Sequence, residues 1–325
     1  MNSDFELELK KWGPQAEGSV SPEAARAYCM RLATGHYENF PVVSWMLPRN
    51  LRPHFYAVYA YCRWADDLAD EVGDPRRAIE LLGWWRSELN DCYAGSVRHP
   101  VFVALRPTIE QFDIPQQPFD DLISAFEQDQ RTTEYETFEQ LSDYCRRSAN
   151  PVGRIVLRLL SQYSEENVRL SDLVCTGLQL ANFWQDVGRD LGIGRVYLPE
   201  EDCRTFGYEM ADLRARVTND AFLELMKFQV DRARDHLQAG LPLAAQVPGR
   251  LQMDIELFIR GGLTILNRIA GIGYRVWEQR PVVTKRDVVM LFLGCTGRMA
   301  ARRLGIRGRA HAGPHVSSNT SGTVK

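Results

Sequence analysis

The chain lacks features that mark several large classes of protein. It has no uninterrupted apolar run of the roughly 18 residues that a membrane-spanning helix needs. Its 7 cysteines are scattered singly, without a Cys-x-x-Cys pair, which argues against a zinc site or a disulfide framework. A net charge of -3 argues against a nucleic-acid-binding protein, which usually carries a basic domain. Asp4, Glu6 and Glu8 interrupt the N-terminal residues, so we expect no signal peptide and a cytoplasmic protein with reduced cysteines.

Alternating strand patterns and internal repeats are missing as well, and apolar residues recur at helical spacing instead. The sequence therefore predicts an all-α protein, and no linker-like break divides its 325 residues. We expect one helical domain over 21–304, after a loosely ordered N-terminus (1–20) and before a disordered tail (305–325). The expected helices are 22–34, 51–72, 76–95, 100–112, 118–129, 138–145, 151–160, 171–191, 219–238, 251–278 and 285–304.

The most informative stretch is 178–191, Leu-Gln-Leu-Ala-Asn-Phe-Trp-Gln-Asp-Val-Gly-Arg-Asp-Leu. Asn182, Asp186 and Asp190 recur every fourth residue, so a helix would place their oxygen atoms in one row. Such a row, with apolar residues beside its start, suits a hard cation such as Mg²⁺, which takes oxygen ligands and often shares them with phosphate. Taken alone, the pattern is equally compatible with an ordinary charged helix face.

A second acidic cluster lies within the expected helix over 51–72. Asp66, Asp67, Asp70 and Glu71 are four acids within six residues, and Asp66 and Asp70 share one helix face. Their repulsion costs about 0.2–0.5 kcal/mol for each like pair on an exposed helix and more when buried. Neighbouring aromatic residues argue against full solvation of these acids, so bound cations are the better explanation of how their repulsion is reduced. Two such helices facing each other could hold metal ions and bind a diphosphate.

These two motifs resemble the acidic motifs of the squalene/phytoene synthase family, the head-to-head prenyl synthases. The resemblance extends from about residue 27 to 292. Tyr59 and Arg63 precede the first motif, and Gln179, Arg195 and Tyr197 flank the second, as in the family pattern. The resemblance implies an isoprenoid synthase fold, in which a single helical domain surrounds a central cavity capped by two metal-binding helices.

Departures from the family pattern narrow the assignment. Tyr37 and Asn39 stand where the family has serines after a histidine, and Asn150-Pro151 stands where most members have glycine and an apolar residue or threonine. Both departures resemble the hydroxysqualene synthase branch found in bacterial hopanoid pathways. That branch makes hydroxysqualene from presqualene diphosphate by ionisation and water capture. A third departure is Gly262, where some relatives have a tyrosine; we interpret it as a sign of a more open pocket.

The resemblance, together with the chemistry of diphosphate departure, implies a set of site residues and a cofactor. A cation would act as a Lewis acid on the leaving group, so Mg²⁺ is expected, and no nucleotide-binding fingerprint calls for NADPH. The expected metal ligands are Asp66, Asp70, Asn182, Asp186 and Asp190. The expected substrate-binding residues are Arg63, Gln179, Arg195, Tyr197, Arg280, Phe40 and Phe183. The expected catalytic residues are His36, Tyr37, Asn39, Tyr59 and Asn150; three of these, Tyr37, Asn39 and Asn150, would position the capturing water.

Several readings stay open at this point. The chain could instead condense two farnesyl or geranylgeranyl diphosphates to presqualene diphosphate, squalene or phytoene, or it could be a non-enzymatic assembly protein on the same fold. Its two complete acidic rows argue against the last reading. Asp129 could belong to the site or to an ordinary helix, and His99 has no partner spacing typical of a ligand set. The expected partners are presqualene or farnesyl diphosphate, an upstream presqualene diphosphate synthase and, since the substrate is water-insoluble, the inner membrane surface.

Overall fold

The computed structural model describes residues 3–35, 48–247 and 251–282, together with Thr284, Asp287, Leu291 and Cys295. In this part of the chain the regular structure is helical, without a strand, and the all-α prediction is confirmed. The helices up to the second acidic row are α1 (Ser3–Trp12), α2 (Pro22–Gly35), α4 (Arg52–Asp70), α5 (Pro75–Ala94), α6 (Pro100–Phe112), α7 (Gln117–Asp129), α8 (Phe138–Ser148), α9 (Asn150–Leu159) and α10 (Glu165–Gly192). The helices after it are α11 (Glu200–Thr205), α12 (Met210–Arg214), α13 (Asp220–Gly240), α14 (Leu243–Gln246) and α15 (Leu251–Gly271).

Capping residues explain where the expected helix bounds were right and where they were wrong. α5 begins after Asp74, whose carboxylate accepts a hydrogen bond from the Arg76 amide, with Pro75 at the first helical position. α10 begins earlier than expected because Ser164 caps it and accepts from the Asn167 amide at 3.2 Å. α15 ends earlier than expected, at Gly271, and the following turn contains a left-handed Gly273.

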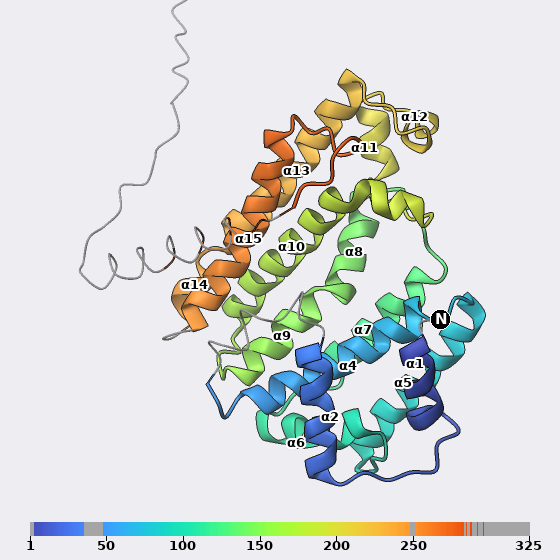
Figure 1. Cartoon of the computed structure of the whole chain (residues 1–325). Helices are drawn as coiled ribbons and strands as arrows, with labels where there is room; N and C mark the ends of the chain where they lie inside the picture. Colours follow the sequence, from blue (N-terminus) through green and yellow to red (C-terminus); the bar gives the residue numbers. More distant parts are fainter. Residues whose placement is uncertain are drawn as a thin grey trace, which may run out of the picture.

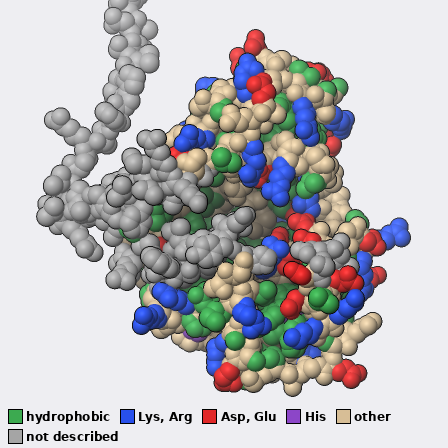
Figure 2. All heavy atoms as spheres, in the orientation of Figure 1, with side chains coloured by type: hydrophobic (Ala, Val, Ile, Leu, Met, Phe, Trp, Pro, Cys, Tyr) green, Lys and Arg blue, Asp and Glu red, His purple; other side chains and the backbone are tan. Residues whose placement is uncertain are grey.

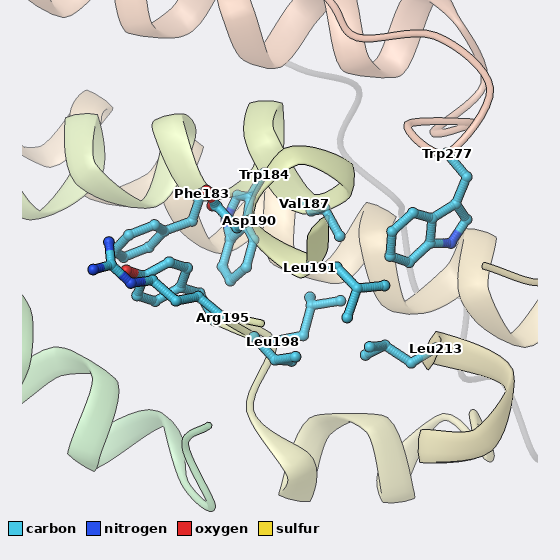
Figure 3. Close-up of a pocket in the computed structure, with 11 residues that line it drawn as sticks. Phe183, Trp184, Val187, Asp190, Leu191, Arg195, Leu198, Leu213 and Trp277 are labelled. Carbon is cyan, nitrogen blue, oxygen red and sulfur yellow. The ribbon is translucent and has the colours of Figure 1, made fainter. Parts of the chain in front are cut away.

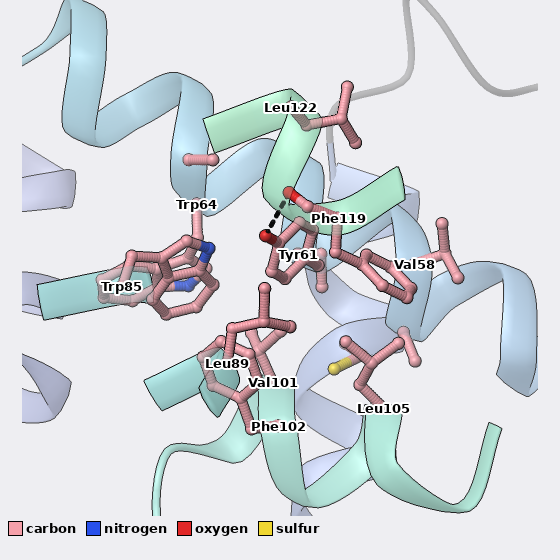
Figure 4. Close-up of a cluster of buried hydrophobic side chains, with 14 of the residues drawn as sticks. Val58, Tyr61, Trp64, Trp85, Leu89, Val101, Phe102, Leu105, Phe119 and Leu122 are labelled. Atoms are coloured by element: carbon pink, nitrogen blue, oxygen red, sulfur yellow. Dashed lines mark hydrogen bonds between the residues drawn. The ribbon is translucent and has the colours of Figure 1, made fainter. Parts of the chain in front are cut away.

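The helices form two groups, each with its own hydrophobic core. In Figure 1, α10, α13 and α15 lie side by side in one group, and α2, α4, α5, α6 and α7 form the other, with α8 and α9 between them. The core of the α4 group surrounds Tyr61, Trp64 and Trp85 (Figure 4). The Tyr61 hydroxyl donates a hydrogen bond to the Phe119 carbonyl at 2.8 Å, so α4 is held to α7 through a satisfied buried polar group. The acidic rows are therefore carried by two different groups.

Small residues let α10, α13 and α15 approach closely. A Cβ atom at Gly240 would come within 2.5 Å of Val174, and one at Gly262 within 2.7 Å of Leu178 and 2.9 Å of Leu237. The interpretation of Gly262 as the sign of a more open pocket is therefore wrong. Gly262 lies where α15 packs closely against α10 and α13, and a larger side chain there would overpack the core.

The structure also corrects the expectation of a loosely ordered segment over 1–20, because residues 3–12 form α1. Phe5 is buried and packs edge-to-face on Trp64 at 5.3 Å, and the Tyr28 hydroxyl donates to Glu8 at 2.8 Å. Phe5, Leu9 and Trp12 share one helix face, a short apolar stripe that predicts this packing. The tail over 305–325 lies outside the described residues, as does most of the helix expected over 285–304. Among the described helices, none combines the length and apolar character needed to span a membrane.

Candidate active site

Asp66 and Asp70 of the first acidic row line a cavity between the helix groups. Asn182, Asp186 and Asp190 are not among its lining residues, and the second row adjoins the cavity through Arg195, whose backbone amide donates to the Asp190 carbonyl at 2.8 Å. The cavity has a volume of about 280 Å³, and Figure 2 shows a hollow in this face of the molecule with charged side chains at its edge. α4, α7, α8, α10 and the segment after α10 all contribute to its wall. The lining residues are Asp66, Asp70, Leu122, Ala125, Phe126, Asp129, Tyr144, Ser148, Gln179, Arg195 and Tyr197. The structure thus brings together Asp66, Asp70, Gln179, Arg195 and Tyr197, which the sequence had predicted as site residues.

Two arginines neutralise one carboxylate in each row. Arg195, which follows α10, donates from Nη2 to Asp70 Oδ1 of α4 at 3.2 Å and so joins the two rows. Arg280 approaches from the segment after α15 and donates through Nε and Nη2 to both oxygens of Asp186, the second contact at 3.2 Å. The Gln185 amide donates to the Pro281 carbonyl at 2.6 Å, which holds this segment against α10.

Arg63 has a different arrangement, on the same helix as its partners. It donates from Nε to Asp67 Oδ2 at 3.0 Å and from Nη2 to the other oxygen of that carboxylate, and its Nη1 lies 3.4 Å from Asp66. Asp67 is buried, whereas Asp66 and Asp70 line the cavity. Asp67 therefore positions Arg63 at the edge of the first row.

Three carboxyl groups in or beside the cavity wall have raised pKa values, mainly because they are buried. Loss of hydration raises the pKa of Asp66 to about 6, with a further contribution from Asp70. The pKa of Asp190 is raised to about 6 by burial and by Asp186, and that of Asp129 to about 6 mainly by burial, although Arg195 opposes the last shift. Such a site favours the arrival of positive charge.

The two rows offer oxygen donors, the type of ligand that a hard cation prefers. The rows supply carboxylate oxygens, and the Asn182 side chain is exposed on the same face of α10 as Asp186. Within the described residues, no three histidine, cysteine, aspartate or glutamate side chains lie close enough together to hold a metal ion as they stand. Arg195 and Arg280 supply the positive charge in this arrangement.

An aromatic wall adjoins the acidic rows. Phe183 stacks on Tyr197 with ring centroids 3.8 Å apart and an interplanar angle of 13°, and Tyr144 lies 6.1 Å from the Tyr197 ring. Figure 3 shows Phe183 and Arg195 at one end of the neighbouring small pocket and Trp277 at the other. The stacked rings thus place an apolar surface directly beside charged groups.

The other predicted residues have varied positions. Tyr59 is half-buried on α4, and burial raises its pKa. His36, Tyr37, Asn39 and Phe40 lie outside the described residues.

Asn150, predicted to be catalytic, is not among the residues that line this cavity. It is buried, its Oδ1 accepts from the Thr176 hydroxyl at 3.0 Å, and it borders a separate hollow with Arg154 and Asp172. Asn150 therefore fastens the start of α9 to α10.

Asp129 and Tyr144 line the cavity but were not predicted from the sequence as site residues. The Tyr144 hydroxyl donates to Asp129 Oδ2 at 2.8 Å, and the other carboxylate oxygen, Oδ1, is buried without a hydrogen-bond partner. Leu122, Phe126 and Asp129 recur at helical spacing, so the sequence did carry a signal that Asp129 shares the inward face of α7.

Comparison with known proteins gives consistent results. Residues 33–287 match the family model described as squalene/phytoene synthase. The chain is 34% identical over 223 residues to a hydroxysqualene synthase of Rhodopseudomonas palustris, covering 68% of this chain and 75% of that protein. It is 32% identical over 244 residues to a 15-cis-phytoene synthase of a Synechocystis species, covering 71% and 72%. The crystal structure of squalene synthase HpnC from Alicyclobacillus acidocaldarius is similar with a TM-score of 0.75 and 44% identity, covering 78% of this chain and 95% of that one.

Proposed function

Because this chain belongs to the squalene/phytoene synthase family, we propose that it converts presqualene diphosphate to hydroxysqualene in squalene and hopanoid biosynthesis. The observation that carries the proposal is that Arg195 joins Asp70 of the first acidic row, in the cavity wall, to the end of the second row, beside stacked aromatic rings. Relatives named hydroxysqualene synthase, at 34% and 32% identity, support the choice of reaction. In this reaction the carbon–oxygen bond to diphosphate breaks, the diphosphate leaves with the electron pair, and water supplies the new hydroxyl group and loses a proton.

We propose Mg²⁺ as the cofactor and no NADPH. Asp66, Asp70, Asn182, Asp186 and Asp190 would hold the cations, consistent with carboxylates whose charge is incompletely balanced. Bound there, Mg²⁺ would stabilise the negative charge that develops on the leaving diphosphate.

The remaining roles belong to the chain's own side chains. Arg195, Arg280 and Arg63 would bind phosphate oxygens through their planar forks. Phe183 and Tyr197 would shield the carbocation from uncontrolled water, and their ring faces would stabilise positive charge. We propose Tyr37 and Asn39 as the residues that position the capturing water, whereas Asn150 is engaged by Thr176.

A second candidate is the condensation of two farnesyl or geranylgeranyl diphosphates. The relatives named phytoene synthase, at 30–32% identity, favour this alternative. A non-enzymatic assembly role on the same fold would give no reason to retain two complete acidic rows, each with mutually repelling carboxylates.

Product analysis of the purified protein with Mg²⁺ distinguishes these candidates. We expect hydroxysqualene from presqualene diphosphate and no product from farnesyl diphosphate. Formation of presqualene diphosphate or squalene from farnesyl diphosphate would show that the protein catalyses the condensing reaction instead. A folded protein that is inactive on both substrates would support the assembly role. Tyr37→Ser and Asn39→Ser should lower the ratio of alcohol to hydrocarbon; an unchanged ratio would exclude these two residues.

We also propose a cytoplasmic protein that contacts the inner membrane surface around the end of α10, where an upstream presqualene diphosphate synthase could deliver its product. Ile193 is 65% exposed, and the exposed Arg216 lies against the same end of α10, donating to the Gly188 carbonyl at 3.3 Å. Exposed apolar side chains among basic ones are typical of peripheral contact with anionic lipid.

The membrane contact can be tested by co-sedimentation with vesicles of phosphatidylglycerol and phosphatidylcholine. Ile193→Ser is expected to lower the bound fraction about fivefold or more, because the variant loses an isoleucine side chain that would be buried in the lipid. Leu7→Ser is the matched control, because Leu7 is also 65% exposed but lies on α1. Equal binding by the wild type and Ile193→Ser would refute this contact surface.

A further inference from the structure

Each acidic row contains one carboxylate that pairs with an arginine from a distant segment of the chain. Arg195 pairs with Asp70 at 3.2 Å, and the arginine side chain is only 20% exposed. Arg280 holds both oxygens of Asp186. A guanidinium fork matches carboxylate and phosphate equally well, so the same N–H groups cannot serve both anions at once.

We propose that Asp70 and Asp186 hold Arg195 and Arg280 away from the diphosphate until cations take over the two carboxylates. The idea rests on the proposed function, because it assigns an order of events to that same cavity. Cations bound to the rows would release both arginines, and the arginines would then bind the diphosphate. Without cations, the diphosphate would have to break the ion pairs and leave two carboxylates uncompensated.

The two pairs are suited to this exchange by their positions. Both join residues far apart in the sequence, and neither arginine lies in a helix, so either one can turn without disturbing a helix. The Arg63–Asp67 pair differs, because both residues belong to α4 and Asp67 is buried and outside the rows. This pair would remain whether or not the rows are occupied, so Arg63 would offer phosphate only its Nη1 group, which the hydrogen bonds to Asp67 do not use.

The exchange has a thermodynamic consequence that does not depend on turnover. Cation and diphosphate binding become positively coupled through the released arginines, in addition to any direct contact between them. Removing the restraining carboxylate should therefore increase the affinity for diphosphate when no cation is present, although the same carboxylate is needed when cations are present.

Calorimetric titration with inorganic pyrophosphate in excess EDTA tests the proposal. We expect weak binding by the wild type and about tenfold or tighter binding by Asp70→Ala and by Asp186→Ala, because each frees one arginine. Alanine is preferred to asparagine, whose carbonyl oxygen could still accept a hydrogen bond from the arginine. The double variant Asp70→Ala/Arg195→Gln should lose the gain.

Asp190→Ala is the matched control. It removes one negative charge from the same site, but Asp190 forms no ion pair in the described part of the chain and senses Arg195 and Arg280 only at longer range. Equal gains in all three single variants would mean a general charge effect and would overturn the proposal, as would no gain in Asp70→Ala and Asp186→Ala. Circular dichroism establishes that each variant is folded. A wild type that turns over neither prenyl diphosphate would refute the proposed function but not the restraint of the arginines.

Discussion

Replacing Asp66 or Asp190 by asparagine is expected to lower turnover of the prenyl diphosphate substrate by about 10³-fold, with the fold retained. Each substitution keeps the shape of the side chain and removes one negative charge, one from each acidic row. Burial, and then a neighbouring carboxylate of the same row, raises the pKa of both groups to about 6, so each carboxylate would gain from a bound cation. The loss should appear mainly in kcat, because the developing charge on the leaving group is greatest in the transition state.

Asp172→Asn provides the control for this prediction. Asp172 also lies on α10, but it pairs with Arg154 at 2.6 Å and borders a separate hollow. Its turnover should stay within about threefold of the wild type, because this partly buried pair lies outside both acidic rows. A loss of less than tenfold in both Asp66→Asn and Asp190→Asn would contradict a cation role for the rows. Far-ultraviolet circular dichroism and thermal melts separate inactivity from unfolding.

The largest predicted stability effect comes from His99, which caps α6 inside the α4 group. Its Nδ1 accepts from the Val101 amide at 3.2 Å, so the ring is neutral in this role. The ring is 2% exposed and lies between tryptophan side chains, with centroid distances of 4.5 Å to Trp64 and 4.9 Å to Trp85. Burial, and then the charge of Arg98, lowers the pKa of His99 to about 3.

This shift predicts a loss of stability in acid. The unfolded histidine takes up a proton near pH 6.5, whereas the folded one does so only near pH 3. The folded state therefore loses about 1.4 kcal/mol of unfolding free energy per pH unit as the pH falls from 6.5 towards 3, up to ~4–5 kcal/mol in total. The stability is fully present above the unfolded pKa.

Urea unfolding of the wild type and His99→Asn between pH 7 and 4 measures this effect. Asparagine keeps a capping oxygen but does not titrate, so the variant should be less stable at pH 7 and should lose less stability on acidification. Carboxyl groups with raised pKa values, such as Asp129 and Asp254, act in the opposite direction but are common to both proteins. Parallel pH profiles of the two proteins would exclude His99 as the source of acid sensitivity.

The helical class and the two acidic rows could be predicted from the sequence because they depend on local periodicity. Asp66 and Asp70, like Asp186 and Asp190, are one turn apart, and any helix places them on one face. Pro75 and Asp74 likewise marked the start of α5 through chemistry confined to one turn. The short stripe of α1 was missed because its apolar residues are mixed with charged ones, and its stability depends on Trp64, far along the chain.

Tertiary packing determined which groups meet in and beside the cavity. Periodicity identifies the face of a helix but not the neighbour of that face, so nothing local predicts that Arg195 reaches Asp70 or that Arg280 reaches Asp186. The same packing brought Asp129 into the wall and directed Asn150 towards Thr176. The sequence by itself thus determined the helices and the charge that each one carries. The packing of α4, α7 and α10 determined how those charges are balanced, because ion pairs between distant segments form only where the packed helices bring them within reach.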